Sequence, residues 1–379
     1  MTWTQDPMYV SGMLCLFVLL SVWLSRYKGF RTIGTPILVI LITAIAANIG
    51  VVPAATSGNA VYTGVFVYLA PMGIFIALLE VDLSSLKKVG VPILLMFGLG
   101  AVGTVIGVLI AWFIVQPEPE IGSMANAVAG MYTGTYIGGS INFNAIALSF
   151  KVNEQADLYA AATVVDNLIG TPWIIATLIL PKYLQRFFPR KKLISESKVP
   201  QKIKVEESIS IAGMAAILGL AFLAMAISKL VYLSFPKIPE IIVLTSLALI
   251  LAQIPTIRRT SGTHTIGFFL ILIFLATIGT LCDLGTLSGL EDLAGTLVVF
   301  VGLVVLIHGL VIFGVGSLFR VDWDVIAVAS QANVGGNTTA LASAESLNRP
   351  DLLIPGVLVG SLGNALGTYA GFFIAGALG

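Results

Sequence analysis

The chain has 379 residues, of which 57% are hydrophobic and only 10% are charged, and its mean hydropathy is +1.00. A soluble domain carries about 25% charged residues, so this composition indicates an integral membrane protein. The formal net charge of +1 argues against a nucleic-acid partner. The two cysteines are lone thiols in apolar runs, so we expect neither a disulfide framework nor a zinc site.

Twelve apolar segments follow one another along the chain, each near the ~20 residues that a helix needs to cross a bilayer. Their approximate limits are 8–25, 33–50, 61–79, 89–116, 122–150, 157–180, 209–234, 238–254, 264–284, 292–319, 323–345 and 352–378. The first segment lacks a basic region and a cleavage site, so we count it as a span. The sequence therefore predicts an all-α polytopic membrane protein.

The two halves of the chain carry matching glycine motifs in the same order. Residues 136–144 read YIGGSINFN, and about 197 residues later residues 333–339 read NVGGNTT. At the same offset, residues 166–171 (DNLIGT) match residues 363–368 (GNALGT). Duplicated, glycine-interrupted segments in the two halves of a membrane protein point to the binding site of a transporter.

The matches predict two repeats joined by a basic linker. Repeat 1 covers residues 1–180, the linker covers 181–208, and repeat 2 covers 209–379. A core or transport domain is expected from residues 122–180 and 323–379 with their neighbouring helices. The linker holds eight basic residues near a membrane end, so we expect it to be a cytoplasmic loop.

The basic residues favour re-entrant hairpins at the two glycine segments. If all twelve segments crossed the membrane, the clusters at 26–31 and 87–88 would lie opposite the linker, against the positive-inside bias. If segments 122–150 and 323–345 enter and return, 17 of the 20 basic residues lie on one side. Five crossings then remain in each repeat, so the repeats become inverted. Glycine-broken helices that cross fully are the alternative.

Both glycine pairs lie among uncharged polar side chains. Broken backbone at membrane depth is tolerated only where it is buried in protein or lines a wet cavity, and the free helix ends there can hold ions or substrate. We expect substrate binding at Thr135, Tyr136, Gly138, Gly139, Ser140, Asn142, Asn333, Gly335, Gly336, Asn337 and Thr338. The alternative is that single hydroxyl residues are close contacts between helices.

Asp166 is an acid in the middle of an apolar segment. Such a residue costs about 2.5–3.5 kcal/mol on insertion scales and normally serves an ion or proton path. We expect Na⁺ or H⁺ coupling through Asp166, Asn167, Asn364, Thr368 and Gln331, and no other metal. The second half has Gly363 at the position of Asp166, so one coupling carboxylate is the simplest interpretation. A hydrogen bond between helices is the alternative role.

The remaining ionisable residues favour structural roles. Glu80 and Asp82 end the third segment, and we expect solvated ends or helix caps there, with the lining of an entrance as the alternative. His308 lies in an apolar run and is expected to be hydrogen-bonded within the structure. Walker A, His-Glu-x-x-His and Gly-x-Ser-x-Gly signatures are absent from the sequence, so we expect neither an enzyme nor a cofactor.

Residues 138–147 (GGSINFNAIA), the Asp-Asn pair at 166–167 and residues 332–342 (ANVGGNTTALA) resemble the YjcL-like integral membrane family, known as domain of unknown function 819. The resemblance covers essentially the whole chain. More distantly, the layout is similar to the fold group of sodium/proton antiporters, bile-acid symporters and 2-hydroxycarboxylate carriers. That likeness implies inverted repeats, an elevator-type secondary transporter coupled to Na⁺ or H⁺, and a homodimer as a candidate assembly. The chain departs from an anion carrier in having no basic residue near either motif.

We therefore expect a secondary active transporter in the plasma (inner) membrane that moves a small-molecule substrate by alternating access. Its partners would be the lipid bilayer, the substrate and a coupling ion. An ion channel using the same hairpins and a non-transporting membrane receptor are the rival functions. The sequence leaves the substrate, the coupling ion, the direction and the oligomeric state open.

Overall fold

The computed structural model describes residues 3–27, 30, 35–54, 59–83, 85–86, 89–190, 209–281 and 291–379. Lys28, Arg31, Lys87, Lys88 and residues 191–208 of the predicted linker lie outside the described residues. Within the described ranges every regular element is a helix, which confirms the all-α fold class.

Eight of the described helices are long and apolar enough to cross a membrane, and two shorter apolar helices accompany them. Each of the ten segments expected to cross contains one of these helices. The long ones are α1 (Pro7–Leu24), α4 to α5 (Ala60–Leu78), α6 (Val91–Val115), α10 (Ala156–Phe187), α11 (Ile211–Ser234), α14 (Thr263–Leu281), α15 to α16 (Glu291–Leu318) and α19 (Leu353–Leu378), and the shorter ones are α3 (Thr35–Asn48) and α12 (Glu240–Ala252).

The two glycine segments each form a pair of helices. They are α8 (Ala125–Gly138) with α9 (Ser140–Ser149), and α17 (Trp323–Val334) with α18 (Gly336–Ser346). Two single-turn helices, α7 (Glu118–Ile121) and α13 (Pro255–Arg258), lie in connections. The breaks therefore fall at the glycine pairs.

Both pairs are hairpins, because the second helix folds back along the first. Across the first break, a Cβ added to Gly134 would lie 2.7 Å from Cδ1 of Ile146. Across the second, the Thr339 hydroxyl donates a 2.8 Å hydrogen bond to the carbonyl of Gln331. Gly139 and Gly336 adopt φ of +95° and +76°, a region that favours glycine. The inverted orientation of the repeats in a membrane stays a prediction.

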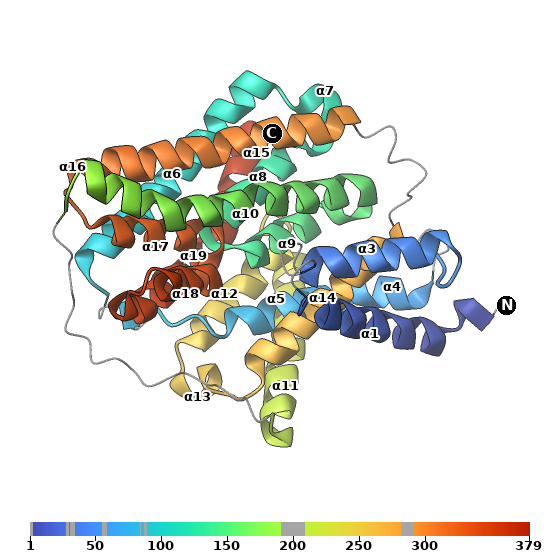
Figure 1. Ribbon diagram of the computed structural model, residues 1–379. Helices are drawn as coiled ribbons and strands as arrows, with labels where there is room; N and C mark the ends of the chain where they lie inside the picture. The colour runs from blue at the N-terminus through green and yellow to red at the C-terminus, as the bar shows by residue number, and fades with distance from the viewer. Residues whose placement is uncertain are drawn as a thin grey trace.

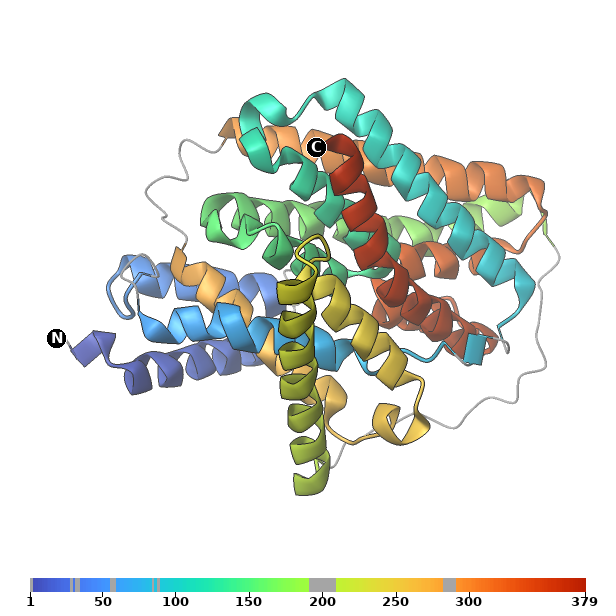
Figure 2. The ribbon, with the colours of Figure 1, turned by 180° about the vertical axis from the view of Figure 1, so that it is seen from behind.

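The helices form two lobes, which Figures 1 and 2 show from opposite sides. Lobe A contains α1, α3, α4 to α5, α11, α12 and α14, and lobe B contains α6, α8 to α10 and α15 to α19. Each lobe takes three of the expected segments from each half of the chain. Lobe B contains both glycine hairpins and the residues of the expected core domain.

Helix α8 packs closely against α19 along a glycine ridge, which we define as Gly130, Gly134, Gly138, Gly363, Gly367 and Gly371. The two helices are antiparallel, because Gly130 meets Gly371 and Gly134 meets Gly367. A Cβ added to Gly130 would lie 2.7 Å from the carbonyl oxygen of Gly371, a distance that real side chains do not reach. Small residues at this ridge therefore let the two backbones touch, as in other membrane helix pairs.

The helix of the sixth apolar segment is longer than the sequence predicts. The sixth segment was expected to end at residue 180, but α10 continues to Phe187 and takes in the first seven residues of the predicted linker. Leu180 and Leu184 pack against a core cluster of lobe B, so the helix is still paired with apolar surface beyond the expected end. The sequence places the end of the helix too early, because Lys182 and Arg186 interrupt the apolar run.

Replacing Gly130 by Ala should destabilise the protein by about 1–3 kcal/mol, because the added methyl group overpacks the contact with α19. The measurement is a thermal melt of the purified protein in detergent. Gly219→Ala in α11 is the matched control, because a Cβ there meets nothing within 4 Å and alanine favours the helix. Equal melting temperatures for the two variants would contradict the close packing.

Candidate functional site

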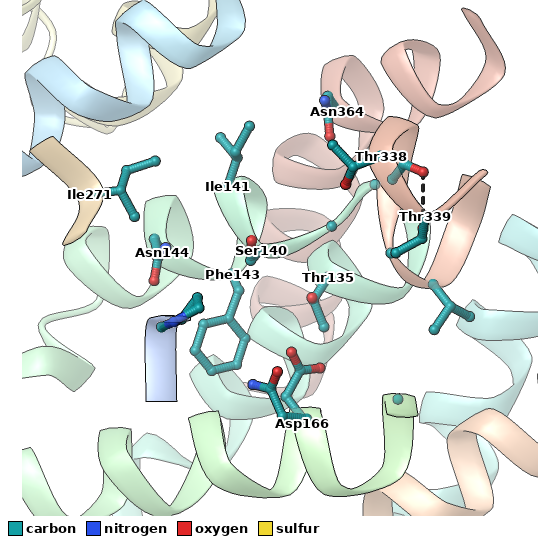
Figure 3. A pocket seen from close by; sticks show the side chains of 18 of the residues that line it. Thr135, Ser140, Ile141, Phe143, Asn144, Asp166, Ile271, Thr338, Thr339 and Asn364 are labelled. Carbon is teal, nitrogen blue, oxygen red and sulfur yellow. Dashed lines mark hydrogen bonds between the residues drawn. The ribbon is translucent and has the colours of Figure 1, made fainter. Parts of the chain in front are cut away.

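The tips of the two hairpins meet between the lobes. A Cβ added to Gly139 would lie 3.5 Å from the carbonyl of Gly335, and one added to Gly336 would lie 3.1 Å from the carbonyl oxygen of Gly138. A cavity of about 430 Å³ lies beside this meeting point, and Figure 3 shows it from close by. Small-molecule sites typically have volumes of roughly 300–1,000 Å³, so the cavity can hold a small solute.

Both lobes contribute walls to the cavity. Lobe B provides the hairpin tips, one face of α10 and Asn364 of α19. Lobe A provides the residues Pro36, Ala77, Glu80, His264, Phe268, Ile271 and Leu275, from α3, from α5 and the residues after it, and from α14. A site between two lobes changes shape when one lobe moves relative to the other.

Most of the site residues expected from the sequence line this cavity. They are Thr135, Tyr136, Gly138, Gly139, Ser140, Gly335, Gly336, Asn337 and Thr338 of the expected substrate site, and Asp166, Asn167 and Asn364 of the expected ion site. The structure thus brings both sets to one place. Their roles in binding stay predictions.

Four expected site residues do not line the cavity and instead join helices. The Thr368 hydroxyl donates a 2.7 Å hydrogen bond to Asn142. The Asn333 amide donates to the carbonyl of Phe97, and the Gln331 amide donates to the hydroxyl of Thr177. All four are at most 1% exposed. Asn142, Gln331 and Asn333 turn to the sides of the hairpins that face other helices. Thr368 lies on α19 and faces the first hairpin. The sequence does not show these side-chain directions.

Asp166 lies on α10 with polar neighbours around it. The Tyr136 hydroxyl lies 3.5 Å from the backbone carbonyl oxygen of Asp166, and Asn167 donates a 2.9 Å hydrogen bond to the carbonyl of Thr163. Among the described residues that line the cavity there is neither Lys nor Arg. The carboxylate of Asp166 therefore faces the cavity without a fixed cation of the protein opposite it.

Two buried polar side chains beside the hairpin tips are free to bind something in the cavity. Thr135 is 2% exposed and Asn364 is 6% exposed, and both line the cavity. Neither side chain has a hydrogen bond within the described part of the chain, although buried polar groups are normally paired. Asn364 is next to the start of α18, because its Oδ1 would lie 3.5 Å from a Cβ on Gly336.

The cavity also contains residues to which sequence reasoning gave another role or no role. Glu80, expected as a helix cap, lines the cavity with its carboxylate 3.4 Å from Nδ1 of His264. Asp82 fits the expectation better, since it accepts a hydrogen bond from the backbone of Ser85 and pairs with Arg258 at 2.9 Å. The apolar lobe A residues carried no signal in the sequence.

His308 supports the hairpins through a buried network. Its Nδ1 lies 2.9 Å from the carbonyl oxygen of Gly100, which only accepts, so this nitrogen carries the hydrogen. In the neutral ring Nε2 then accepts from the Ser330 hydroxyl at 2.9 Å, and Ser330 accepts from the indole of Trp173 at 3.0 Å. The network fixes α6, α10, α15 and α17 together, as the expected structural role requires.

Buried ion pairs close the base of the second hairpin. Arg349 lies 2.6 Å from Asp322, 3.0 Å from Asp324 and 2.7 Å from Asp351, and its side chain is only 5% exposed. Burial alone would lower the pKa of Arg349, but the hydrogen bonds that it donates to Asp351 and Asp322 outweigh burial and raise the pKa. The start of α17 and the segment after α18 are therefore held together by charge.

Two comparisons with known proteins identify the family of this chain. The model of the family described as "Protein of unknown function (DUF819)" matches residues 12–379. The chain is also 29% identical to the "Uncharacterized membrane protein YjcL" of Bacillus subtilis (strain 168), over 98% of this chain and 96% of that protein. With its apolar helices, the chain is an integral multi-pass membrane protein, and it belongs to the DUF819 family.

Proposed function

We propose that this protein is a secondary active transporter that carries a small solute by alternating access and couples this movement to Na⁺ or H⁺. One observation supports this function above all. A cavity of about 430 Å³ lies between two lobes, at the point where two glycine hairpins meet and where a carboxylate faces the cavity. Broken helices at such a depth are typical of the binding sites of transporters.

Asp166 is the residue through which a cation would act. A carboxylate at membrane depth is costly unless a cation or a proton neutralises it, so its occupancy changes the energy of moving the site through lipid. Asn167 lies beside it on α10 and supplies a further oxygen. Lobe B would then move between its inward-open and outward-open positions only when Asp166 is neutralised. This requirement couples the movement of the solute to that of the cation.

The positive-inside bias indicates the side to which the cavity opens. Two polar residues of its wall in lobe A, His264 and Glu80, have side chains that are 59% and 30% exposed. His264 lies at the start of α14, shortly after Arg258 in the chain. Glu80 lies just after the end of α5, next to the segment whose Asp82 pairs with Arg258. Basic residues mark the cytoplasmic side, which supports the proposal that the cavity opens to the cytoplasm.

Gradient-driven uptake should depend on Asp166. Purified protein is placed in lipid vesicles with either an inward or an outward gradient of Na⁺ or protons and a mixture of small metabolites, and vesicle contents are compared by mass spectrometry with protein-free vesicles. We expect at least one solute to accumulate, and Asp166→Asn to lower its accumulation at least about tenfold, because a neutral amide can neither balance the charge of Na⁺ nor carry the coupling proton.

Glu154→Gln is the matched control for this experiment, because Glu154 is an exposed acid that pairs with Lys151 away from the cavity. It should accumulate solute as the unaltered protein does. Accumulation of no solute under any of these gradients, inward or outward, would contradict the transporter function, and single-channel currents in planar bilayers would instead indicate a channel.

Thiol labelling should find the cavity open to the cytoplasm. In protein whose two cysteines are replaced, Thr171→Cys on the cavity wall should react with a membrane-impermeant thiol reagent in inside-out vesicles and not in intact cells. Glu154→Cys, at the loop after the first hairpin, should react in intact cells. The reverse pattern would contradict the assigned orientation.

A further inference from the structure

The cavity combines two sites of opposite electrostatic preference. One side contains Asp166, and no Lys or Arg is among the described residues of the wall. At the other side lie the first residues of α9 and α18, and Figure 3 shows Asp166 across the cavity from Thr338 and Asn364. An occupant that satisfies both sides carries a positive and a negative group.

The starts of α9 and α18 form the side that prefers a negative group. Both helices begin at the hairpin tips, where Gly139 meets Gly335 and Gly336, so their N-termini converge. The first N–H groups of a helix have no partner within it, and the helix dipole is positive there. The α9 helix has no side-chain cap, so its first N–H groups remain available to an anion.

Two unpartnered side chains point independently to a ligand at this side. Thr135 and Asn364 are more than nine-tenths buried, line the cavity beside the tips, and have no hydrogen bond within the described residues. A polar group in a narrow cavity is stabilised when a bound molecule supplies the hydrogen bond that the protein does not. A bound carboxylate, with two acceptor oxygens, would supply these hydrogen bonds by accepting from both groups and from the helix N-termini.

We infer that the cavity binds a free amino acid with an apolar side chain, with its ammonium group on Asp166 and its carboxylate on the N-termini of α9 and α18. The assignment builds on the transport function proposed above and names its substrate class. Phe143, Ile271 and Leu275 give the cavity an apolar wall, which fits an aliphatic or aromatic side chain. The substrate crosses as a zwitterion without net charge.

The ammonium group of the substrate and the coupling ion share one carboxylate, that of Asp166. The second half of the chain has Gly363 where the first has Asp166, so Asp166 is the one acid that the described part of lobe B contributes to the cavity. A second acid of the wall, Glu80 of lobe A, lies 3.4 Å from Nδ1 of His264. The ammonium group of the substrate and the coupling Na⁺ or H⁺ therefore compete for Asp166. On each crossing of the membrane, Asp166 is neutralised by either the substrate or the coupling cation, but not by both. The protein would therefore exchange one for the other and not carry both in the same direction.

Thermal-shift titration of the purified full chain tests the charge pattern. The probes are the twenty amino acids and, for leucine and phenylalanine, the matching amines (isopentylamine, phenethylamine) and acids (4-methylpentanoate, 3-phenylpropanoate). Ligand binding to the native state raises the melting temperature by mass action. We expect an aliphatic or aromatic amino acid to bind most tightly, its amine more weakly, and its acid most weakly. Added Na⁺ or protons should weaken binding of the amino acid.

Three variants separate the two ends of the site. Asp166→Asn should weaken the amino acid at least about tenfold, or ~1.4 kcal/mol, and remove the preference for amine over acid. Thr135→Val should weaken the amino acid and leave the amine unchanged, because it removes only a partner of the carboxylate. Glu154→Gln should change neither, because this acid is outside the cavity.

Tighter binding of the acid than of the amine, or binding of none of the twenty amino acids, would overturn the assignment. The transport function fails separately. If the uptake experiment identifies a solute without an amine, transport stands and the amino-acid site falls. If an amino acid binds and no solute accumulates under any gradient, the site stands and transport falls.

Discussion

A backbone that turns back at the depth of a lipid layer leaves N–H and C=O groups without helical partners, and hydrocarbon supplies none. This protein contains two helix breaks in which the chain turns back, and it places them against each other, with Gly139 beside Gly335 and Gly336. Most other features follow from that contact. The glycine ridge brings α19 close to α8, α10 presents Asp166 to the remaining space, and lobe A closes the cavity from the other side.

The sequence predicted the parts of this arrangement that depend on order along the chain. The glycine pairs mark the breaks because positive φ at Gly139 and Gly336 restricts the residue type, and the twelve apolar segments mark the helices. Asp166 stood out because an acid in an apolar run has few structural uses. Each of these signals is local, so a reader of the sequence can recognise it without the three-dimensional structure.

What the sequence could not predict depends on rotation about helix axes and on contacts between distant segments. Asn142 and Asn333 belong to the same motifs as the cavity residues, yet they face neighbouring helices and are hydrogen-bonded there. Ile271 and Leu275 look like ordinary lipid-facing or core residues until α14 is placed beside the hairpins. The end of α10 was missed because its packed apolar face continues among basic residues.

The charges around Arg349 also limit how the protein can change shape. Three carboxylates hold this guanidinium at the base of the second hairpin, and separating them within a low-dielectric surrounding would expose uncompensated charge at a cost of several kcal/mol. This cost opposes any separation of the start of α17 from the segment that follows α18. In the proposed transport cycle, the second hairpin would therefore move as a single unit together with the helices bound to it, and its internal contacts would persist.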